Sequence, residues 1–462
     1  MQNNNQTNEM ATGNIPKLFF KLAIPAVVAQ LVNLLYNIVD RIYIGHIPEV
    51  GASALTGVGL CSAIMMFITA FSMLAGAGGA PLAAIALGKN DKEQAEKIMT
   101  NSFSLLLIFA ALLTVSIYIF APTLLSWFGA SEVTLPYAVD YTRIYILGTV
   151  FVLLVTGMNP FVTTQGFAKI AMLTTVIGAI INIILDPIFI FLLNMGVKGA
   201  ALATILSQGV GAIWILRFLT GKETILKLRK ENMKLDPKIF GPTLALGISP
   251  FVMVSTESLL SISFTTSLAK YGGDIAVGAM TIITSINMLV SMPLQGFCQG
   301  GQPIMSYNFG AGNTDRVKKA FFVQFGVCVA YATIFWGLCM LIPNVFAGIF
   351  TTDAALAEYA SWAIRIYMAG IFSVGFQISC QQSFMALGQA AISLVMAFLR
   401  KLILLIPLIF ILPNFFEDKV FGVFVAEPVS DIIAAAVTTI VFFTQFKKIM
   451  AKSGAAAPQP TE

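Results

Sequence analysis

The second half of this chain repeats the first half, and this repeat constrains the fold more than any other feature. The Arg-Ile-Tyr tripeptide at 143–145 recurs at 365–367, and Gly88 recurs as Gly310, both at an offset of 222 residues. A steady offset over most of the chain indicates two copies of one architectural unit. In a strongly apolar chain, such a repeat is typical of secondary transporters, whose binding site lies between the two halves.

The composition indicates that lipid is the solvent of this chain. Hydrophobic residues make up 57% of it and charged residues 11%, against about 25% charged in ordinary soluble domains. Apolar runs such as 102–120, 170–193 and 321–342 approach the roughly 20 residues that cross a bilayer. Backbone groups in lipid must form hydrogen bonds within helices or a closed barrel. The strands of a barrel alternate polar and apolar residues, and these runs show no strict alternation, which excludes the barrel. The sequence therefore predicts an all-α polytopic membrane protein.

The apolar segments predict twelve transmembrane helices, six in each half. In the first half they span about residues 17–44, 52–80, 94–120, 136–164, 168–194 and 199–220. In the second half they span about residues 240–269, 276–305, 318–342, 356–386, 390–413 and 420–446. Because six is an even number, each half returns to its starting side, and the repeats are parallel about an axis along the membrane normal.

This pattern predicts two lobes joined by a charged linker. The N-lobe is expected at 1–220, the cytoplasmic linker at 221–237 and the C-lobe at 238–450. The segment 451–462 is rich in Ala and Pro and is expected to be disordered.

The basic residues predict the orientation of the chain, because Lys and Arg near short loops stay cytoplasmic. Of the 27 basic residues, most lie in segments on the side of the N-terminus, whereas the loops on the other side carry only Lys198, Lys270 and Lys419. We therefore expect both termini to be cytoplasmic. The net charge of +5 is then a signal of topology, and no nucleic-acid partner is expected.

Polar residues inside the first half predict a binding site. Asn33, Tyr36 and Asp40 form one stripe on the first predicted helix. Asn182 and Asp186 are four residues apart on the fifth helix and share a face. A carboxylate at the bilayer centre costs at least about 2.5–3.5 kcal/mol, and two in one small site cannot both ionise cheaply. This arrangement indicates a proton or sodium switch.

The same site offers enough oxygen atoms for a hard metal ion. Pro187 frees the carbonyl of Ile183 from its usual helical partner, and Thr204 adds a hydroxyl. Na⁺ bound by Asp40, Asn182 and Asp186 is thus possible, although H⁺ is favoured because nothing in the chain fixes a dehydrating geometry. The alternative for Asp40 is a solvated helix end beside Arg41. The predicted cation-coupling residues are Asp40, Asn182, Asp186, Thr204, Tyr36 and Asn33.

The second half lacks this aspartate pair and carries other charges instead. Arg400 and Lys401 lie on the eleventh predicted helix, and Glu427 and Asp431 lie on the twelfth. Opposite charges at similar depth favour a structural ion-pair network. Glu257 has no basic partner within its own helix and is a candidate for a second cation site or for contact with a cationic substrate.

At these residues the chain resembles the multidrug and toxic compound extrusion (MATE) family, in its bacterial DinF/MepA-like branch. The resemblance covers about residues 15–450. It rests on the plan of six plus six helices, on the segments at 22–25 and 36–40, and on the segment at 182–187. It implies a V-shaped pair of lobes that alternates between outward- and inward-open states while exporting amphipathic or cationic drugs.

The resemblance also implies roles for individual residues. Members of this branch bind their coupling ion in the N-lobe, at positions that match Asp40, Asn182, Asp186, Thr204 and Tyr36. In the NorM-like branch, a glutamate resembling Glu257 belongs to a C-lobe sodium site. The tenth-helix aspartate of that branch is missing here. Gln377 and Gln381 are the nearest polar residues, which moves the expected ion site to the N-lobe.

Two other classes of protein are alternatives to a multidrug exporter. A lipid-linked precursor flippase of the same superfamily needs several arginines to hold a diphosphate, and the helices here carry acidic residues instead. An enzyme needs a catalytic set that one histidine and scattered cysteines do not supply. We therefore expect no enzyme activity and no cofactor beyond the coupling ion H⁺ or Na⁺. We also expect a monomer in the cytoplasmic (inner) membrane of a bacterium.

Overall fold

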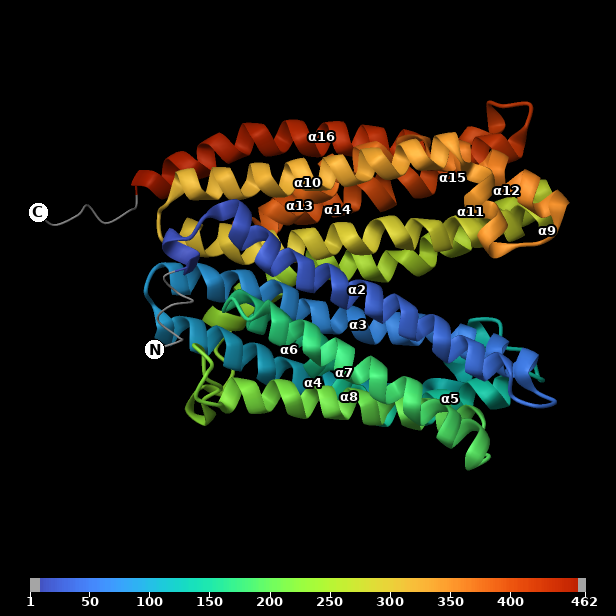
Figure 1. Cartoon of the computed structure of the whole chain (residues 1–462), viewed down its shortest axis with the longest axis horizontal. Helices are drawn as coiled ribbons and strands as arrows, with labels where there is room; N and C mark the ends of the chain where they lie inside the picture. The colour runs from blue at the N-terminus through green and yellow to red at the C-terminus, as the bar shows by residue number, and fades with distance from the viewer. Residues whose placement is uncertain (1–8, 456–462) are drawn as a thin grey trace, which may run out of the picture.

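The computed structural model describes residues 9–455, which form helices joined by short loops (Figure 1). The N-lobe begins with three long helices, α2 (Ile15–Gly45), α3 (Gly51–Gly88) and α4 (Lys92–Trp127). Two shorter helices, α5 (Leu135–Leu147) and α6 (Thr149–Thr164), meet at an angle of 58° and form one bent span. The lobe ends with α7 (Ala168–Pro187), its π-helical extension η1 (Ile188–Leu192) and α8 (Val197–Thr220).

The C-lobe repeats this order after a short 3-10 turn, η2 (Lys230–Asn232), in the linker. Its elements are α9 (Pro237–Gly310), α10 (Thr314–Leu341), α11 (Pro343–Phe350), α12 (Ala354–Tyr367), η3 (Met368–Gly370), α13 (Ile371–Ala386), α14 (Ala390–Phe398), η4 (Leu399–Leu405), α15 (Ile406–Ile411), η5 (Leu412–Asn414) and α16 (Lys419–Ala455). The tenth span is broken at Gly370, which is the repeat partner of Gly148 at the break between α5 and α6.

The described residues confirm the twelve predicted spans. Ten helices are long and apolar enough to cross a membrane, and the bent pair α5 and α6 makes an eleventh. The helix α9 has 74 residues and contains a non-helical residue, Gly273, with φ 64° and ψ −159°. A continuous helix of this length would measure about 110 Å, far more than the roughly 30 Å of the hydrocarbon core. Therefore α9 consists of two spans.

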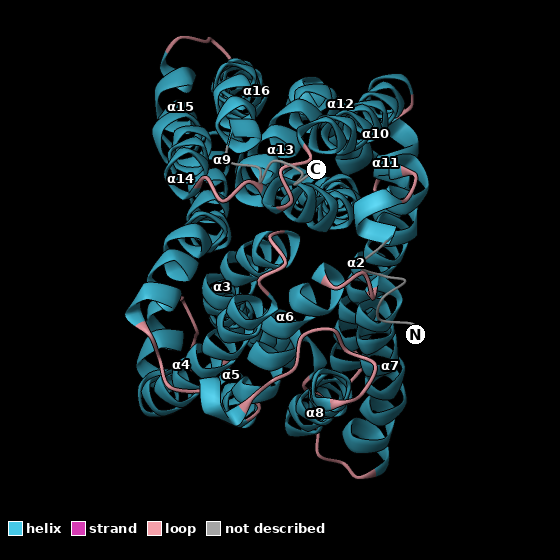
Figure 2. Cartoon of the chain, turned by 90° about the vertical axis from the view of Figure 1, so that its left-hand side faces the viewer, coloured by secondary structure: helices cyan, strands magenta, loops and turns pink. Residues whose placement is uncertain are grey.

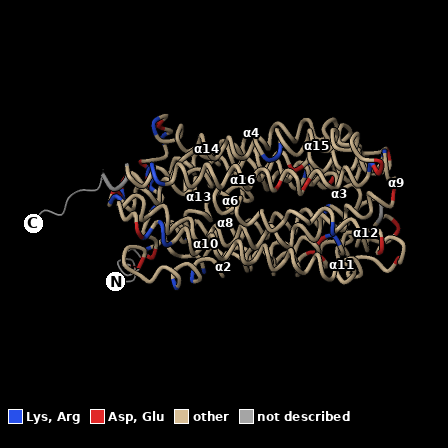
Figure 3. Tube along the Cα trace, turned by 90° about the horizontal axis from the view of Figure 1, so that it is seen from above, with Lys and Arg blue, Asp and Glu red and all other residues tan. Residues whose placement is uncertain are grey.

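The helices gather into two lobes, with both ends of the described chain at the same end of the molecule (Figures 1 and 2). Basic residues also gather at this end (Figure 3). The two ends of the chain lie together because the number of spans is even. The predicted disordered tail is wrong at its start, because α16 continues to Ala455. Residues 456–462 of that tail lie outside the described part of the chain.

Glycines allow the two lobes to touch along the axis of the repeat. A Cβ atom on Gly88 would lie 1.9 Å from the carbonyl oxygen of Tyr307, and one on Gly310 would lie 2.0 Å from that of Ile85. Gly88 and Gly310 are equivalent positions, as are Ile85 and Tyr307, so each contact is the repeat image of the other. Equivalent positions meet only at the axis that relates the repeats. The parallel repeat predicted from the sequence is thus visible in the packing of α3 on α9.

The close contact of α3 and α9 at Gly88 and Gly310 predicts that a larger residue there lowers the stability of the protein. Gly310→Ala forces the backbones of α3 and α9 apart, and we expect a loss of about 1–3 kcal/mol of stability. The matched control is Gly337→Ala in α10, where an added Cβ meets nothing within 4 Å. That change should be neutral or stabilising by up to about 1 kcal/mol. The check is thermal unfolding of both purified variants, and equal melting temperatures would contradict a tight crossing.

The inter-lobe linker is fixed to the N-lobe by buried polar side chains. The Gln165 side-chain oxygen accepts hydrogen bonds from the backbone N–H groups of Ile225 and Leu226, at 2.7 and 2.8 Å. Glu96, which is 3% exposed, pairs with Arg229, and this hydrogen bond raises the pKa of the Arg229 guanidinium. A segment that reads as a linker from its charge alone is therefore a structured part of the N-lobe.

Candidate functional site: buried carboxyl groups in both lobes

The first-helix aspartate lies inside the N-lobe. Asp40 is near the end of α2 and is buried, with 9% of its surface exposed, whereas its neighbour Arg41 is exposed. The alternative of a solvated helix end at Asp40 is therefore wrong. The helix passes through Pro25 without interruption, and its polar stripe faces α7 rather than lipid at the position of Asp40.

Two further helices complete this pocket. Asn182 and Asp186 lie on α7 and Thr204 lies on α8, and all three side chains are buried. The Asn182 Nδ2 atom donates to Asp186 Oδ1 at 3.3 Å and to Thr204 Oγ1 at 3.4 Å. The Thr204 hydroxyl in turn donates to the carbonyl of Ala200 at 3.0 Å. One amide thus holds a carboxyl and a hydroxyl in fixed positions.

The carboxyl groups of Asp40 and Asp186 contact each other across α2 and α7. Three buried oxygen atoms around this contact accept no hydrogen bond: Asp40 Oδ1, Asn182 Oδ1 and Asp186 Oδ2. An unsatisfied buried acceptor costs about 1–3 kcal/mol, and more when it is charged. Two ionised carboxylates in contact also repel each other. The arrangement can hold a cation between the carboxyl groups, either a proton or a small metal ion.

Tyrosines border the aspartate pair. Tyr36 lies close enough to interact electrostatically with both carboxyl groups. Tyr141 on α5 is 1% exposed, stacks on Tyr145 with ring centroids 6.0 Å apart, and lies close to Thr204. Sequence reasoning missed Tyr141, although its spacing of four residues from Tyr145, at the end of the repeated tripeptide, was a usable signal.

Asn33 contributes to the helix backbone rather than to the aspartate pair. Its carbonyl accepts a hydrogen bond from Asn37 Nδ2 at 2.7 Å, and its side chain is half-buried. Asn33 sits two helical turns before Asp40, so the predicted polar stripe is longer than the pocket.

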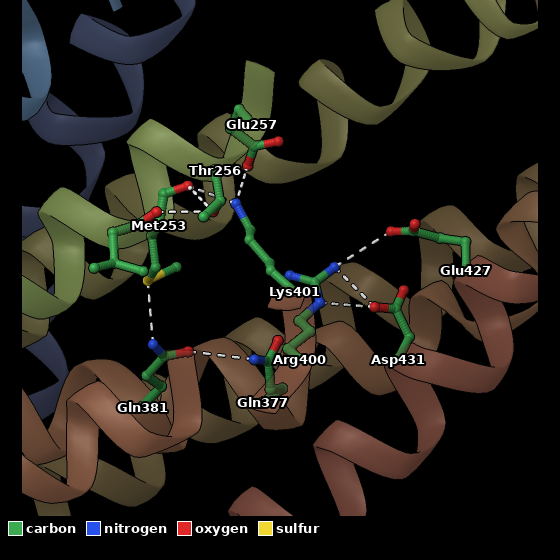
Figure 4. A network of polar contacts seen from close by, with 10 residues as sticks. Met253, Thr256, Glu257, Gln377, Gln381, Arg400, Lys401, Glu427 and Asp431 are labelled. Carbon is green, nitrogen blue, oxygen red and sulfur yellow. Dashed lines mark hydrogen bonds and ion pairs between the residues drawn. The ribbon is translucent and has the colours of Figure 1, made fainter. Parts of the chain in front are cut away.

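The C-lobe carries a second polar network, built from four elements (Figure 4). Lys401 on η4 binds Glu257 on α9 and donates to the carbonyl of Met253 at 2.7 Å. Gln377 on α13 donates to Gln381 Oε1 at 3.2 Å. The Gln381 amide then contacts the sulfur of Met253 at 3.1 Å. Glu257 has no basic partner in its own helix, and its carboxyl group forms an ion pair with the ammonium group of Lys401.

Arg400 binds the two acidic residues of α16 unequally. Its Nε and Nη2 atoms lie 2.9 and 2.8 Å from Asp431 Oδ1, whereas Nη2 lies 3.5 Å from Glu427 Oε1. The Ser430 hydroxyl donates to the Arg400 carbonyl at 3.0 Å. The side chains of Asp431 and Glu427 are buried, and that of Arg400 is 14% exposed. The expected ion pairs form, although Lys401 turns to Glu257 rather than to α16.

An apolar groove of about 470 Å³ lies on the N-lobe between α3 and α4. It is lined by aromatic and aliphatic side chains, among them Phe67, Phe71, Phe109 and Phe120. Phe71 also meets Phe251 of the C-lobe edge to face, with ring centroids 5.3 Å apart. The groove therefore reaches a side chain at the boundary between the lobes.

Two six-span lobes, each with charged groups buried among its helices, are the architecture of a membrane transport protein. The chain belongs to the MatE family, whose sequence profile matches residues 25–188 and 250–411, one segment in each repeat. This confirms the resemblance to the MATE family.

Similar proteins match most of the length of this chain. It is 26% identical to the multidrug export protein MepA of Staphylococcus haemolyticus, over 91% of this chain and 92% of that protein. It is also 26% identical to MepA of Staphylococcus aureus strain N315, over 87% and 88%. An outward-facing multidrug resistance MATE family transporter has the same fold, with a TM-score of 0.89 at 24% identity over 96% of this chain and 98% of that one.

Proposed function

We propose that this protein is a secondary active multidrug exporter of a bacterial cytoplasmic membrane, with both termini in the cytoplasm. It exchanges amphipathic or cationic small molecules for a cation by alternating access of its two lobes. The MatE family membership and the MepA relatives, which are named multidrug export proteins, support the substrate class. The alternative of a lipid-linked precursor flippase finds no support in the polar network of the C-lobe, which holds three carboxyl groups and two cations.

The observation that carries the coupling proposal is the set of unsatisfied oxygen atoms in the N-lobe. Asp40, Asn182 and Asp186 each bury an oxygen atom that accepts no hydrogen bond. A bound proton would turn one carboxyl into a donor to the other and remove one negative charge. Na⁺ would instead need about six oxygen ligands. We therefore propose H⁺ as the coupling ion, bound by the pair Asp40 and Asp186.

Proton binding and substrate binding exclude each other in this mechanism. The ionised pair prefers the state that accepts substrate, and the protonated pair prefers the other state, so each ligand shifts the same equilibrium in opposite directions. Export then follows from the proton gradient, without any direct contact between substrate and proton.

The pH dependence of substrate affinity tests the identity of the ion. Affinity for an ethidium-like dye should fall as pH drops between about 8 and 5, because protonation of the pair removes the state that binds the dye. Efflux of the dye from vesicles should follow an imposed pH gradient and not an imposed Na⁺ gradient. If the affinity for the dye is independent of pH and decreases as the Na⁺ concentration rises, Na⁺ is the coupling ion. Movement of lipid-linked sugars without movement of dye would support the flippase instead.

A further inference from the structure

The polar network of the C-lobe holds one more acidic group than basic groups. Glu257, Glu427 and Asp431 are its carboxyl groups, and Arg400 and Lys401 are its cations. The side chains of Lys401, Glu427 and Asp431 are buried, that of Arg400 is 14% exposed and that of Glu257 is 50% exposed. If all five groups were ionised, the network would carry a net negative charge among transmembrane helices, where an uncompensated charge is costly. A buried network of charges is tolerated when each charge is matched.

Two of the three carboxyl groups have well-formed partners. Lys401 binds Glu257 directly. Arg400 reaches Asp431 through both Nε and Nη2, at 2.9 and 2.8 Å. Glu427 is left with the Nη2 atom that already serves Asp431, at 3.5 Å. The surplus carboxyl is therefore Glu427.

The second oxygen atom of Glu427 is also without a partner. The side chain is 7% exposed, and Oε2 accepts no hydrogen bond. Water is thus excluded from an oxygen atom that, in an ionised carboxylate, would require a donor. A proton on this carboxyl group would cancel the surplus charge of the network in a single step, and a neutral carboxyl group costs less to bury than an ionised one.

We infer that Glu427 is a second proton-binding site of this protein, located in the C-lobe and protonated in the conformation described above. The site is new relative to the N-lobe aspartates and does not depend on them. Sodium or an organic cation fits poorly, because the guanidinium of Arg400 lies 3.5 Å from Glu427 and repels a second fixed cation.

Neither basic residue of the network can offset the surplus negative charge. Loss of the proton from Lys401 would make the network more negative, and Arg400 stays charged. The neighbouring elements η3, α13, α15 and η5 carry no charged residue. The titratable groups that face Glu427 are Asp431 of α16, Arg400 and Lys401 of η4, Glu257 of α9 and Tyr367 of α12.

A second proton site has a consequence for transport, which rests on the function proposed above. If the proton on Glu427 leaves when the lobes move, each cycle carries one proton through the C-lobe in addition to that of the N-lobe pair. The proton site itself is tested without transport, so its failure and the failure of the proposed function can be told apart.

The first test uses the full-length protein in detergent, with Asp40→Asn and Asp186→Asn combined to silence the N-lobe pair. Infrared spectra at neutral pH should retain a band of a protonated carboxyl group, and adding Glu427→Gln should remove it. The melting temperature should fall as pH rises, because the folded state binds one proton more than the unfolded chain. Glu427→Gln should flatten this slope. A band or a slope that survives Glu427→Gln would overturn the inference.

The matched variant is Asp431→Asn, four residues along the same helix. It removes the carboxylate that Arg400 binds well, so the melting temperature should drop at every pH. Glu427→Gln mimics the protonated side chain, so the melting temperature at neutral pH should stay within the error of the parent protein. If the combined background does not fold, both variants can be made in the wild type, where the test is the comparison of their melting temperatures at neutral pH, because the N-lobe pair still binds a proton there. Equal destabilisation by the two changes would show that Glu427 is ionised and structural, which defeats the inference.

Discussion

Asp40→Asn and Asp186→Asn should each reduce dye export to the level of vesicles that contain no transporter, while the protein still folds and reaches the membrane. Each change removes an ionisable group of the N-lobe pair and preserves the volume of the side chain. A site with a single carboxyl no longer needs a bound cation to relieve repulsion, so the equilibrium between the two states loses its dependence on the ion. Efflux under an imposed pH gradient is the measurement.

The matched control for this prediction is Asp140→Asn. Asp140 is also an aspartate of the N-lobe, in the middle of α5, but its side chain is 45% exposed and pairs with Lys198 at 3.3 Å. Exposed pairs of this kind contribute about 0–1 kcal/mol, so export should persist. Wild-type export by both pocket variants would rule out coupling at this pair.

Arg400→Gln should lower the stability of the protein by about 3–5 kcal/mol, since it leaves buried carboxyl groups without their cation. Asp431 loses both of its close contacts to Arg400. The effect appears as a lower melting temperature of the purified variant in detergent. It should exceed any change in substrate range, because the network fixes α16 against η4.

Arg143→Gln provides the comparison for Arg400→Gln. Arg143 is exposed on α5, with its guanidinium 5.7 Å from the ring centroid of Tyr118, a contact of about 0.5–1 kcal/mol at an exposed site. Its loss should shift the melting temperature little. If the two variants melted alike but Arg400→Gln changed which dyes are exported, the C-lobe network would belong to the substrate path.

The residues of the N-lobe pocket could be predicted because they are polar side chains at helical spacing in apolar segments. Asn182 and Asp186 share a face through their separation of four residues, and burial of a carboxylate in lipid is too costly to occur without a role. Tyr141 was missed because an amphipathic tyrosine in a membrane helix is ordinary. Its importance comes from the fold of α5 against α8.

The C-lobe shows the limit of the same reasoning. Glu427 and Asp431 look alike in the sequence, four residues apart on one helix and opposite the same two basic residues. The π-helical segment η4 turns Lys401 toward α9 and Arg400 toward α16. The exclusion of Glu427 from a full ion pair follows from that turn, which no spacing rule predicts.

The sequence by itself determined the lipid environment, the number of spans, the parallel repeat and the aspartates of the N-lobe. These properties depend on composition and on periodicities within single helices, where physical constraints act between neighbours in the chain. The tertiary structure alone decided which charges meet, which oxygen atoms stay without donors, and where Gly88 and Gly310 bring the lobes into contact. Those features depend on distances of a few ångströms between separate helices, and such distances are set by the packing of all side chains together.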